Sequence, residues 1–155
     1  MTTFKCLSVS QPFADLIVKG KKTIELRSWD TRYRGEFLIH SPLKIKSDDC
    51  KRLEIDEGSL AVGAIVGKAT IYDVRTYKTQ REWQLDEKYH FAGPEFAGAK
   101  YGFLLKNAKK FSIPIPHKGK LGFFDVNMKD AKPKDQDITS EIFDEEYRTQ
   151  WINHH

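Results

Sequence analysis

Short segments in which apolar and polar residues alternate recur along most of the chain, and they limit the fold to a β-rich domain. Side chains of a strand point to opposite faces in turn, so this period of two is typical of a strand with one buried face. Gly63 and Gly67 interrupt the longest segment, where a strand bends or approaches another backbone closely. Six segments have this β character: residues 5–10, 23–27, 37–40, 60–72, 101–105 and 121–126.

The first two predicted strands are separated by a short amphipathic helix. Pro12 suits a first helical position, and the apolar residues after it follow the spacing of one helix face, so a helix is predicted over residues 12–19. Gly20 ends this helix, since glycine readily adopts the left-handed conformation after a last turn. About six strands with short helices between them predict an α+β domain, a small barrel of mixed strands.

Three further segments are predicted to be helical or irregular. Residues 44–56 are charged with sparse apolar positions, which indicates a surface helix. Residues 76–99 mix charged and aromatic side chains without a regular period, and we expect a helix or loop excursion over the mouth of a ligand site. Residues 138–152 carry an apolar stripe at helical spacing, which predicts a helix docked on the barrel. We therefore expect one barrel domain over residues 1–129 and an acidic extension over 130–155.

Charge is unevenly distributed along the 155 residues. Residues 130–155 hold three Lys or Arg against seven Asp or Glu, whereas residues 1–129 hold 23 against 15. A basic body favours a polyanionic partner, because phosphates are held largely by Lys and Arg, although solubility alone explains such an excess equally well. No run approaches the roughly 20 apolar residues of a membrane span, and the start lacks the apolar core of a secretory signal. We expect a cytoplasmic protein with no membrane association.

Cysteine and histidine spacings argue against a metal or redox site. Cys6 and Cys50 lie far apart outside any Cys-x-x-Cys motif, so both are expected to be reduced, with Cys6 packed in the core. His40, His90 and His117 are scattered without metal-ligand spacing. The sequence therefore predicts no metal and no cofactor.

Residues 20–27, Gly-Lys-Lys-Thr-Ile-Glu-Leu-Arg, have the form G-x-K-x-x-E-x-R and follow a helix that opens with Gln11-Pro12. This octapeptide resembles the hallmark of the ASCH domain, the activating-signal-cointegrator homology family of the PUA-like superfamily. Three further stretches resemble the family in the same order, and the resemblance covers about residues 4–127. These stretches are residues 34–41, 62–67 and 114–122.

The resemblance implies a PUA-like β-barrel with a cleft between the barrel and the first helix, lined by the hallmark motif. It also implies that the ligand is RNA, single-stranded or structured, or a nucleotide-like molecule such as a modified nucleoside. A few members of the family are hydrolases: one branch removes the acetyl group of N4-acetylcytidine, and another is described as a ribonuclease. No obligate protein partner is implied.

Lys22, Glu25 and Arg27 are the central candidates for ligand binding. Glu25 and Arg27 lie two residues apart in a predicted strand and therefore share a face. Arg27 can offer its planar fork to a phosphate or a base edge, while Glu25 orients it or accepts from a base amine. The alternative is an exposed ion pair that contributes only about 0–1 kcal/mol to stability.

Lys22 and Glu25 are also the candidate catalytic residues, and the sequence leaves open whether the chain is an enzyme. A buried Lys with a lowered pKa can act as a base or a nucleophile. The amidohydrolase branch carries a matching Lys, but it has a Thr where this chain has Glu25, with Thr23 one strand step away. A catalytic hydroxyl would thus have become a carboxylate.

The remaining candidate ligand-binding residues flank the motif or lie in the other family-like stretches. Trp29, Tyr33 and Arg34 combine aromatic faces with a cation, the usual means of holding single-stranded bases and phosphate, although Trp29 also suits a core position. Gln11 opens the first helix, and Ser41 lies in the family-like stretch near the cleft. Lys118 belongs to the basic turn 117–120, which suits phosphate binding or an ordinary hairpin.

Overall fold

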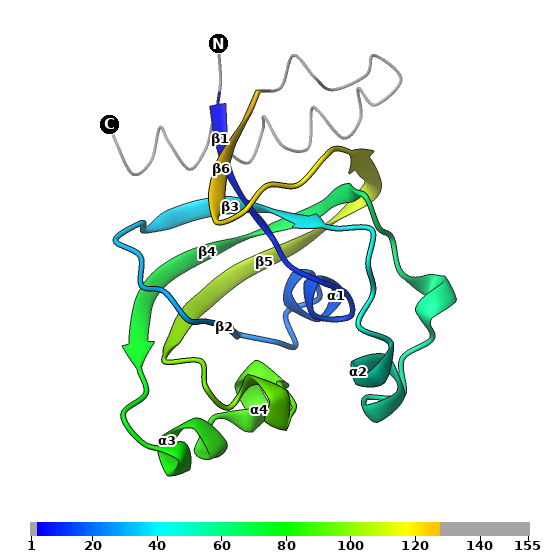
Figure 1. Ribbon diagram of the computed structural model, residues 1–155. Helices are drawn as coiled ribbons and strands as arrows, with labels where there is room; N and C mark the ends of the chain where they lie inside the picture. The colour runs from blue at the N-terminus through cyan, green and yellow to red at the C-terminus, as the bar shows by residue number, and fades with distance from the viewer. Residues whose placement is uncertain (1–2, 128–155) are drawn as a thin grey trace.

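The computed structural model describes residues 3–127, which form one mixed six-stranded sheet with short helices around it (Figure 1). The sheet order is β2-β5-β4-β3-β1-β6; β1 is parallel to β3, and all other neighbours are antiparallel. The hydrogen bonds therefore run from β2 to β6 without joining them, and the sheet is barrel-like but open. The strands are β1 (Thr3–Ser8), β2 (Ile24–Arg27), β3 (Gly35–Ser41), β4 (Ala64–Thr76), β5 (Tyr101–Pro116) and β6 (Phe123–Asn127).

This architecture confirms the predicted α+β class and the number of strands. The fifth strand is much longer than predicted, because it continues through residues 106–113 and includes residues 114–116, which the sequence predicts to form a separate link. A proline is tolerated there because the partner strand β4 has a register shift between Ile65 and Gly67, where the ladder is interrupted. The predicted surface helix over 44–56 is shorter than expected and is limited to α2 (Ser47–Arg52). The 3₁₀ turn η1 (Glu57–Ser59) follows beyond the predicted range.

Helix α1 (Phe13–Val18) packs against β4 and β5 and is buried along its whole length (Figure 1). It ends as the sequence predicts: Lys19 is the last residue in helical geometry, and Gly20 follows with φ of +79°. Val18 meets β4 at Gly67, where an added Cβ would lie 2.6 Å from Val18 Cγ1 and would overlap the main-chain oxygen of Lys109. Only glycine permits this approach of helix and sheet.

The core is divided between the two faces of the sheet. The larger cluster joins α1 to the inner residues of β3, β4 and β5, and includes Phe37, Ile39 and Phe103. A second cluster contains Cys6 and Phe124, on β1 and β6. Both cysteines are buried free thiols, as expected.

Residues 77–99 form a compact excursion between β4 and β5 with a small core of its own. It contains α3 (Gln80–Leu85), α4 (Glu87–His90) and the 3₁₀ turn η2 (Pro94–Phe96), and it begins with a capping box between Thr79 and Glu82. Trp83 is the central buried side chain of this excursion. The predicted C-terminal helix over 138–152 and the acidic extension fall outside the described residues. None of the helices within 3–127 has the length and apolar character that a membrane crossing requires.

Candidate functional site

A pocket of about 440 Å³ opens between β1, β2, α1 and the excursion, and we call it the motif pocket. Its volume falls within the range of small-molecule sites, about 300–1,000 Å³. Polar and apolar side chains share its lining, which suits a ligand with both an aromatic ring and charged groups. The lining comprises Ser8, Val9, Ser10, Phe13, Lys22, Glu25, Leu26, Arg27, Ser28, Trp29, Lys46, Ala92, Glu95, Phe96, Gly98 and Ala99.

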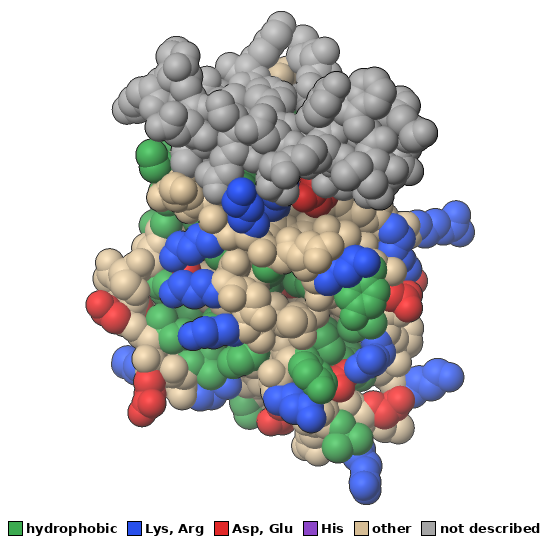
Figure 2. All heavy atoms as spheres, turned by 180° about the vertical axis from the view of Figure 1, so that it is seen from behind, with side chains coloured by type: hydrophobic (Ala, Val, Ile, Leu, Met, Phe, Trp, Pro, Cys, Tyr) green, Lys and Arg blue, Asp and Glu red, His purple; other side chains and the backbone are tan. Residues whose placement is uncertain are grey.

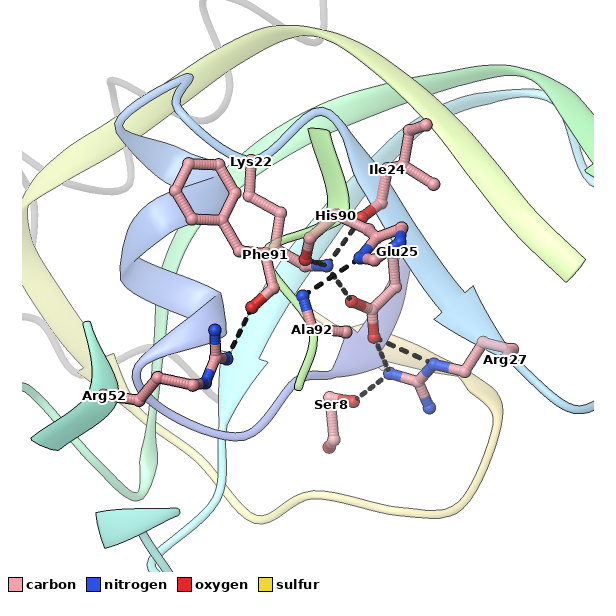
Figure 3. Close-up of polar contacts among 9 residues, drawn as sticks. All are labelled: Ser8, Lys22, Ile24, Glu25, Arg27, Arg52, His90, Phe91 and Ala92. Carbon is pink, nitrogen blue, oxygen red and sulfur yellow. Dashed lines mark hydrogen bonds and ion pairs between the residues drawn. The ribbon is translucent and has the colours of Figure 1, made fainter. Parts of the chain in front are cut away.

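The three charged residues of the octapeptide meet in this pocket, with Glu25 between the two cations (Figure 3). Arg27 Nε donates to Glu25 Oε2 at 3.0 Å, Arg27 Nη2 lies 2.9 Å from the same oxygen, and Lys22 Nζ lies 3.4 Å from Oε1. Glu25 and Arg27 thus share a face of β2, as their spacing predicts. Glu25 neutralises one of the two positive charges, and the motif as a whole remains positive.

Lys22 is the most deeply buried member of the motif. Its ammonium donates to the main-chain carbonyls of Ile24 and His90, each at 2.6 Å, and its third hydrogen faces Glu25. Burial lowers the pKa of Lys22, and the neighbouring Glu25 opposes that shift. Lys22 therefore links β2 to the end of α4 and holds the excursion against the barrel.

Arg27 is fixed on one side and open on the other. Besides Glu25, its Nη2 donates to the main-chain oxygen of Ser8 at 2.7 Å. Within residues 3–127 its Nη1 has no hydrogen-bond partner, and a fifth of the side chain is exposed. A guanidinium held in this way presents two N–H groups to a ligand at little further cost in side-chain entropy.

Aromatic rings form the apolar part of the motif pocket. Trp29 packs edge-on against Phe103 at 5.3 Å and against Phe123 at 5.9 Å, while the Arg27 guanidinium lies 5.8 Å from its ring centre. Trp29 thus occupies the core position that the sequence also allows, and it lines the pocket as well. Phe96, from the excursion, contributes a second ring.

Hydrogen bonds to main-chain carbonyls and to the His90 imidazole hold the excursion beside the pocket. Arg52 of α2 donates to the carbonyl of Phe91 at 2.6 Å, next to the carbonyl of His90 that Lys22 binds (Figure 3). The Ala92 N–H donates to His90 Nδ1, so His90 is neutral and donates from Nε2 to the carbonyl of Trp83. The pocket wall formed by residues 92–99 is therefore well supported.

Comparison with known proteins identifies the family. The sequence profile of the ASCH domain matches residues 7–119, well over half of the chain. The chain belongs to the ASCH domain family. This PUA-like family is associated with RNA binding.

Curated and structural relatives agree with this assignment. Activating signal cointegrator 1 of Homo sapiens is 29% identical over 126 residues, and that of Mus musculus is 28% identical. Each alignment covers 74% of this chain but only 21% of the relative, so this chain spans about a fifth of the length of these two relatives. The crystal structure of ASCH from Zymomonas mobilis superimposes with a TM-score of 0.60 at 16% identity, covering 81% of this chain and 89% of that one. At that identity the likeness concerns the fold alone.

Five predicted ligand-binding residues lie outside the motif pocket of this ASCH domain. Gln11 and Ser41 are buried and both donate to the carbonyl of Ala61, so they hold the turn before β4. Tyr33 packs on Phe123 and donates to the carbonyl of Glu36. Arg34 is exposed, with its Nη2 3.7 Å from Asp73 Oδ1, and it lines a separate pocket of about 410 Å³. Lys118 lines another pocket. Charge and aromatic character could not separate Tyr33 and Arg34 from Arg27 and Trp29, because the difference lies in where the chain turns after β2.

The prediction missed several residues of the motif pocket. Ser8 is the last residue of β1, and Ser10 lies two residues beyond it. Lys46 precedes α2, with its ammonium 5.3 Å from the centre of the Phe96 ring. Glu95 lines the pocket from the excursion. The pocket assembles these residues from segments far apart in sequence, and no local pattern connects them. Among the described residues no group of three or more His, Cys, Asp or Glu is arranged to hold a metal ion.

Basic side chains are not confined to the motif pocket. Figure 2, which shows the molecule from behind, has Lys and Arg spread over the described surface with Asp and Glu among them. The charge excess of residues 1–129 therefore does not locate the site by itself, and the geometry of the pocket has to do so.

The ASCH domain is expected to lose stability as the pH falls below about 6.5. His40 and His90 are buried, and burial lowers the pKa of both below the ordinary value of 6.5. As the pH falls, the unfolded chain takes up protons first, so the free energy of unfolding is highest above pH 6.5 and declines below it. Urea unfolding at about pH 7.5, 6.5 and 5.5 measures this decline.

Asp15 and Asp86 do not account for a change in this window. Burial raises the pKa of Asp15 and Asp86, but ion pairs and hydrogen bonds outweigh it, so both lie below the ordinary 3.8. Their contribution to stability is present above pH 3.8 and is lost only in stronger acid. A free energy of unfolding that stays constant between pH 7.5 and 5.5 would contradict the prediction.

Proposed function

We propose that this ASCH domain binds RNA, or a modified nucleoside within it, by accepting one base and its phosphate in the motif pocket. The observation that carries the proposal is the Lys22–Glu25–Arg27 cluster, which holds Arg27 Nη1 ready for a ligand beside the ring of Trp29. A base can stack against the aromatic lining, since every base has a π-face and stacking tolerates differences in sequence. Arg27 would donate to phosphate or to a base carbonyl, and Glu25 would accept from a base amine.

The alternative, a hydrolase with Lys22 as base or nucleophile, has less support in the geometry. Both short hydrogen bonds of the Lys22 ammonium go to main-chain carbonyls, and one of these carbonyls belongs to His90 at the end of α4, within the excursion. A neutral amine at this position would direct its lone pair toward groups that can only accept. This arrangement favours binding over catalysis, and incubation with N4-acetylcytidine or with RNA, followed by product analysis, tests the alternative directly.

Replacing Arg27 by alanine is expected to weaken binding of single-stranded RNA by about 10- to 100-fold. A hydrogen bond to a charged group contributes about 1.5–3 kcal/mol, and the motif would lose its net positive charge, since Lys22 and Glu25 neutralise each other. The slope of log affinity against log salt should also fall by about 0.7, since one phosphate contact is lost from a single strand. Fluorescence anisotropy at several salt concentrations measures both quantities.

Arg34→Ala is the matched control, because Arg34 is exposed on the connection between β2 and β3 and lies outside the motif pocket. It removes the same charge and should change the affinity by no more than about twofold. Equal losses in the two variants would mean that general charge, and not the motif pocket, holds the RNA.

A further inference from the structure

A second pocket, of about 780 Å³, lies next to the motif pocket and is separate from the residues of the proposed base site. We call it the loop pocket, because the loop 117–121 between β5 and β6 forms one of its sides. Its charged lining is entirely basic, from Lys118 and Lys120, whereas the motif pocket contains Glu25 and Glu95. The loop pocket therefore offers a positive environment that suits phosphate.

Ser8, at the end of β1, is the residue that both linings share. Its main-chain oxygen accepts from Arg27 in the motif pocket, at 2.7 Å. Its hydroxyl lies 2.9 Å from His40 Nδ1, at the loop pocket. A single residue of one strand thus separates the two pockets, and a ligand that fills one reaches the border of the other.

The border at Ser8 is rigid. His40 Nε2 lies 2.7 Å from the carbonyl of His117, and since a carbonyl can only accept, Nε2 carries the hydrogen and Nδ1 accepts from the Ser8 hydroxyl. The loop backbone lies close against this pair: a Cβ added to Gly119 would be 2.5 Å from Ser8 Oγ and 2.7 Å from His40 Cε1. The hydrogen bonds from Ser8 to His40 and from His40 to His117 therefore hold the loop beside Ser8, whose carbonyl binds Arg27.

The loop pocket has the two components that a single-stranded nucleic acid needs. His117, half-exposed, lies nearly parallel to Phe124 at 6.3 Å and gives a supported ring on which a base can stack. The ammonium groups of the exposed Lys118 and Lys120 can follow a phosphate. Stacking rings beside cations along a groove are the usual scheme for a single strand.

We infer that the loop pocket receives the nucleotide adjacent to the one in the motif pocket. The inference rests on the proposed function and narrows its ligand class. The ligand is a single-stranded oligonucleotide of two or more residues that passes over Ser8, and not a free nucleoside or mononucleotide.

The test compares ligands of increasing length on the intact chain. The probes are the four ribonucleoside 5′-monophosphates and 5′-phosphorylated random-sequence RNA of two, four and eight nucleotides, titrated by calorimetry or anisotropy. Wild type should bind the dinucleotides at least about tenfold more tightly than the monophosphates, because a second base stacks and a second phosphate is held. Lys118→Ala/Lys120→Ala should abolish this difference of about tenfold in affinity between dinucleotides and monophosphates.

The control is Lys51→Ala/Lys78→Ala, which removes the same charge from two exposed positions outside both pockets. It should preserve the difference in affinity between dinucleotides and monophosphates. If wild type binds monophosphates and dinucleotides equally, or if both double variants weaken every ligand alike, the inference is wrong although the proposed function stands. If wild type binds neither monophosphates nor RNA of any length, the proposed function fails together with the inference.

Discussion

Replacing Lys22 by methionine is expected to lower the free energy of unfolding by about 3–5 kcal/mol, although the substitution keeps most of the apolar volume. The change leaves two buried main-chain carbonyls, of Ile24 and His90, without their donor. Each unsatisfied buried acceptor costs roughly 1–3 kcal/mol, and Glu25 also loses a cation. Urea unfolding of the variant and of wild type at about pH 7.5 measures the difference.

Lys21→Met provides the control for this prediction. Lys21 is the neighbouring lysine, and it is exposed, so its replacement should change the free energy of unfolding by less than about 0.5 kcal/mol. If Lys22→Met proves as stable as Lys21→Met, the ammonium does not support the fold, and its role would have to be sought in the chemistry of the pocket.

The expected instability of Lys22→Met affects how any loss of function in that variant is understood. Lys22 holds the carbonyl of His90, and the chain from Ala92 onward forms a wall of the motif pocket. Loss of the ammonium would therefore loosen the wall as well as remove a charge. A lost activity or affinity in a Lys22 variant is evidence for catalysis only if the folded fraction and the excursion are unchanged, whereas Arg27→Ala leaves both carbonyls paired.

Much of the fold could be predicted because it is encoded in local patterns. Alternation placed the strands, and Pro12 and Gly20 bounded α1 within a residue or two. The length of β5 could not be predicted, because residues 106–113 have no strong alternation and join the sheet through the pairing of Lys106, Lys109 and Lys110 with β4. In that segment the tertiary partner decides the structure.

The candidate site, like the fold, could be predicted only where a local sequence pattern encodes it. Glu25 and Arg27 are two residues apart on one strand, so their pairing follows from the period of two. The partners of Lys22 are carbonyls, which every residue has, so no sequence pattern marks them. Ser8 and Phe96 reach the motif pocket through the sheet order and the path of the excursion, which are properties of the whole fold.

Replacing Gly67 by alanine is expected to destabilise the ASCH domain by about 3 kcal/mol, at the upper end of the usual cost of overpacking. The new Cβ would overlap the main-chain oxygen of Lys109 and press on the side chain of Val18. The carbonyl cannot retreat without breaking the β4–β5 ladder, so the strain would fall largely on α1. Gly98→Ala is the control, since nothing lies within 4 Å of an added Cβ there, and it should change stability by less than about 0.5 kcal/mol.

Gly67→Ala also tests whether the position of α1 sets the shape of the motif pocket. Phe13, at the start of α1, lines the pocket, whereas Val18, at its end, receives the pressure from Gly67. A helix of six residues moves as a unit, so a shift at Val18 should also move Phe13 away from Trp29 and Arg27. RNA affinity measured on the folded fraction should therefore fall, although no residue that touches the ligand has changed. Unchanged affinity in a destabilised variant would mean that the pocket is fixed by β2 and the excursion without α1.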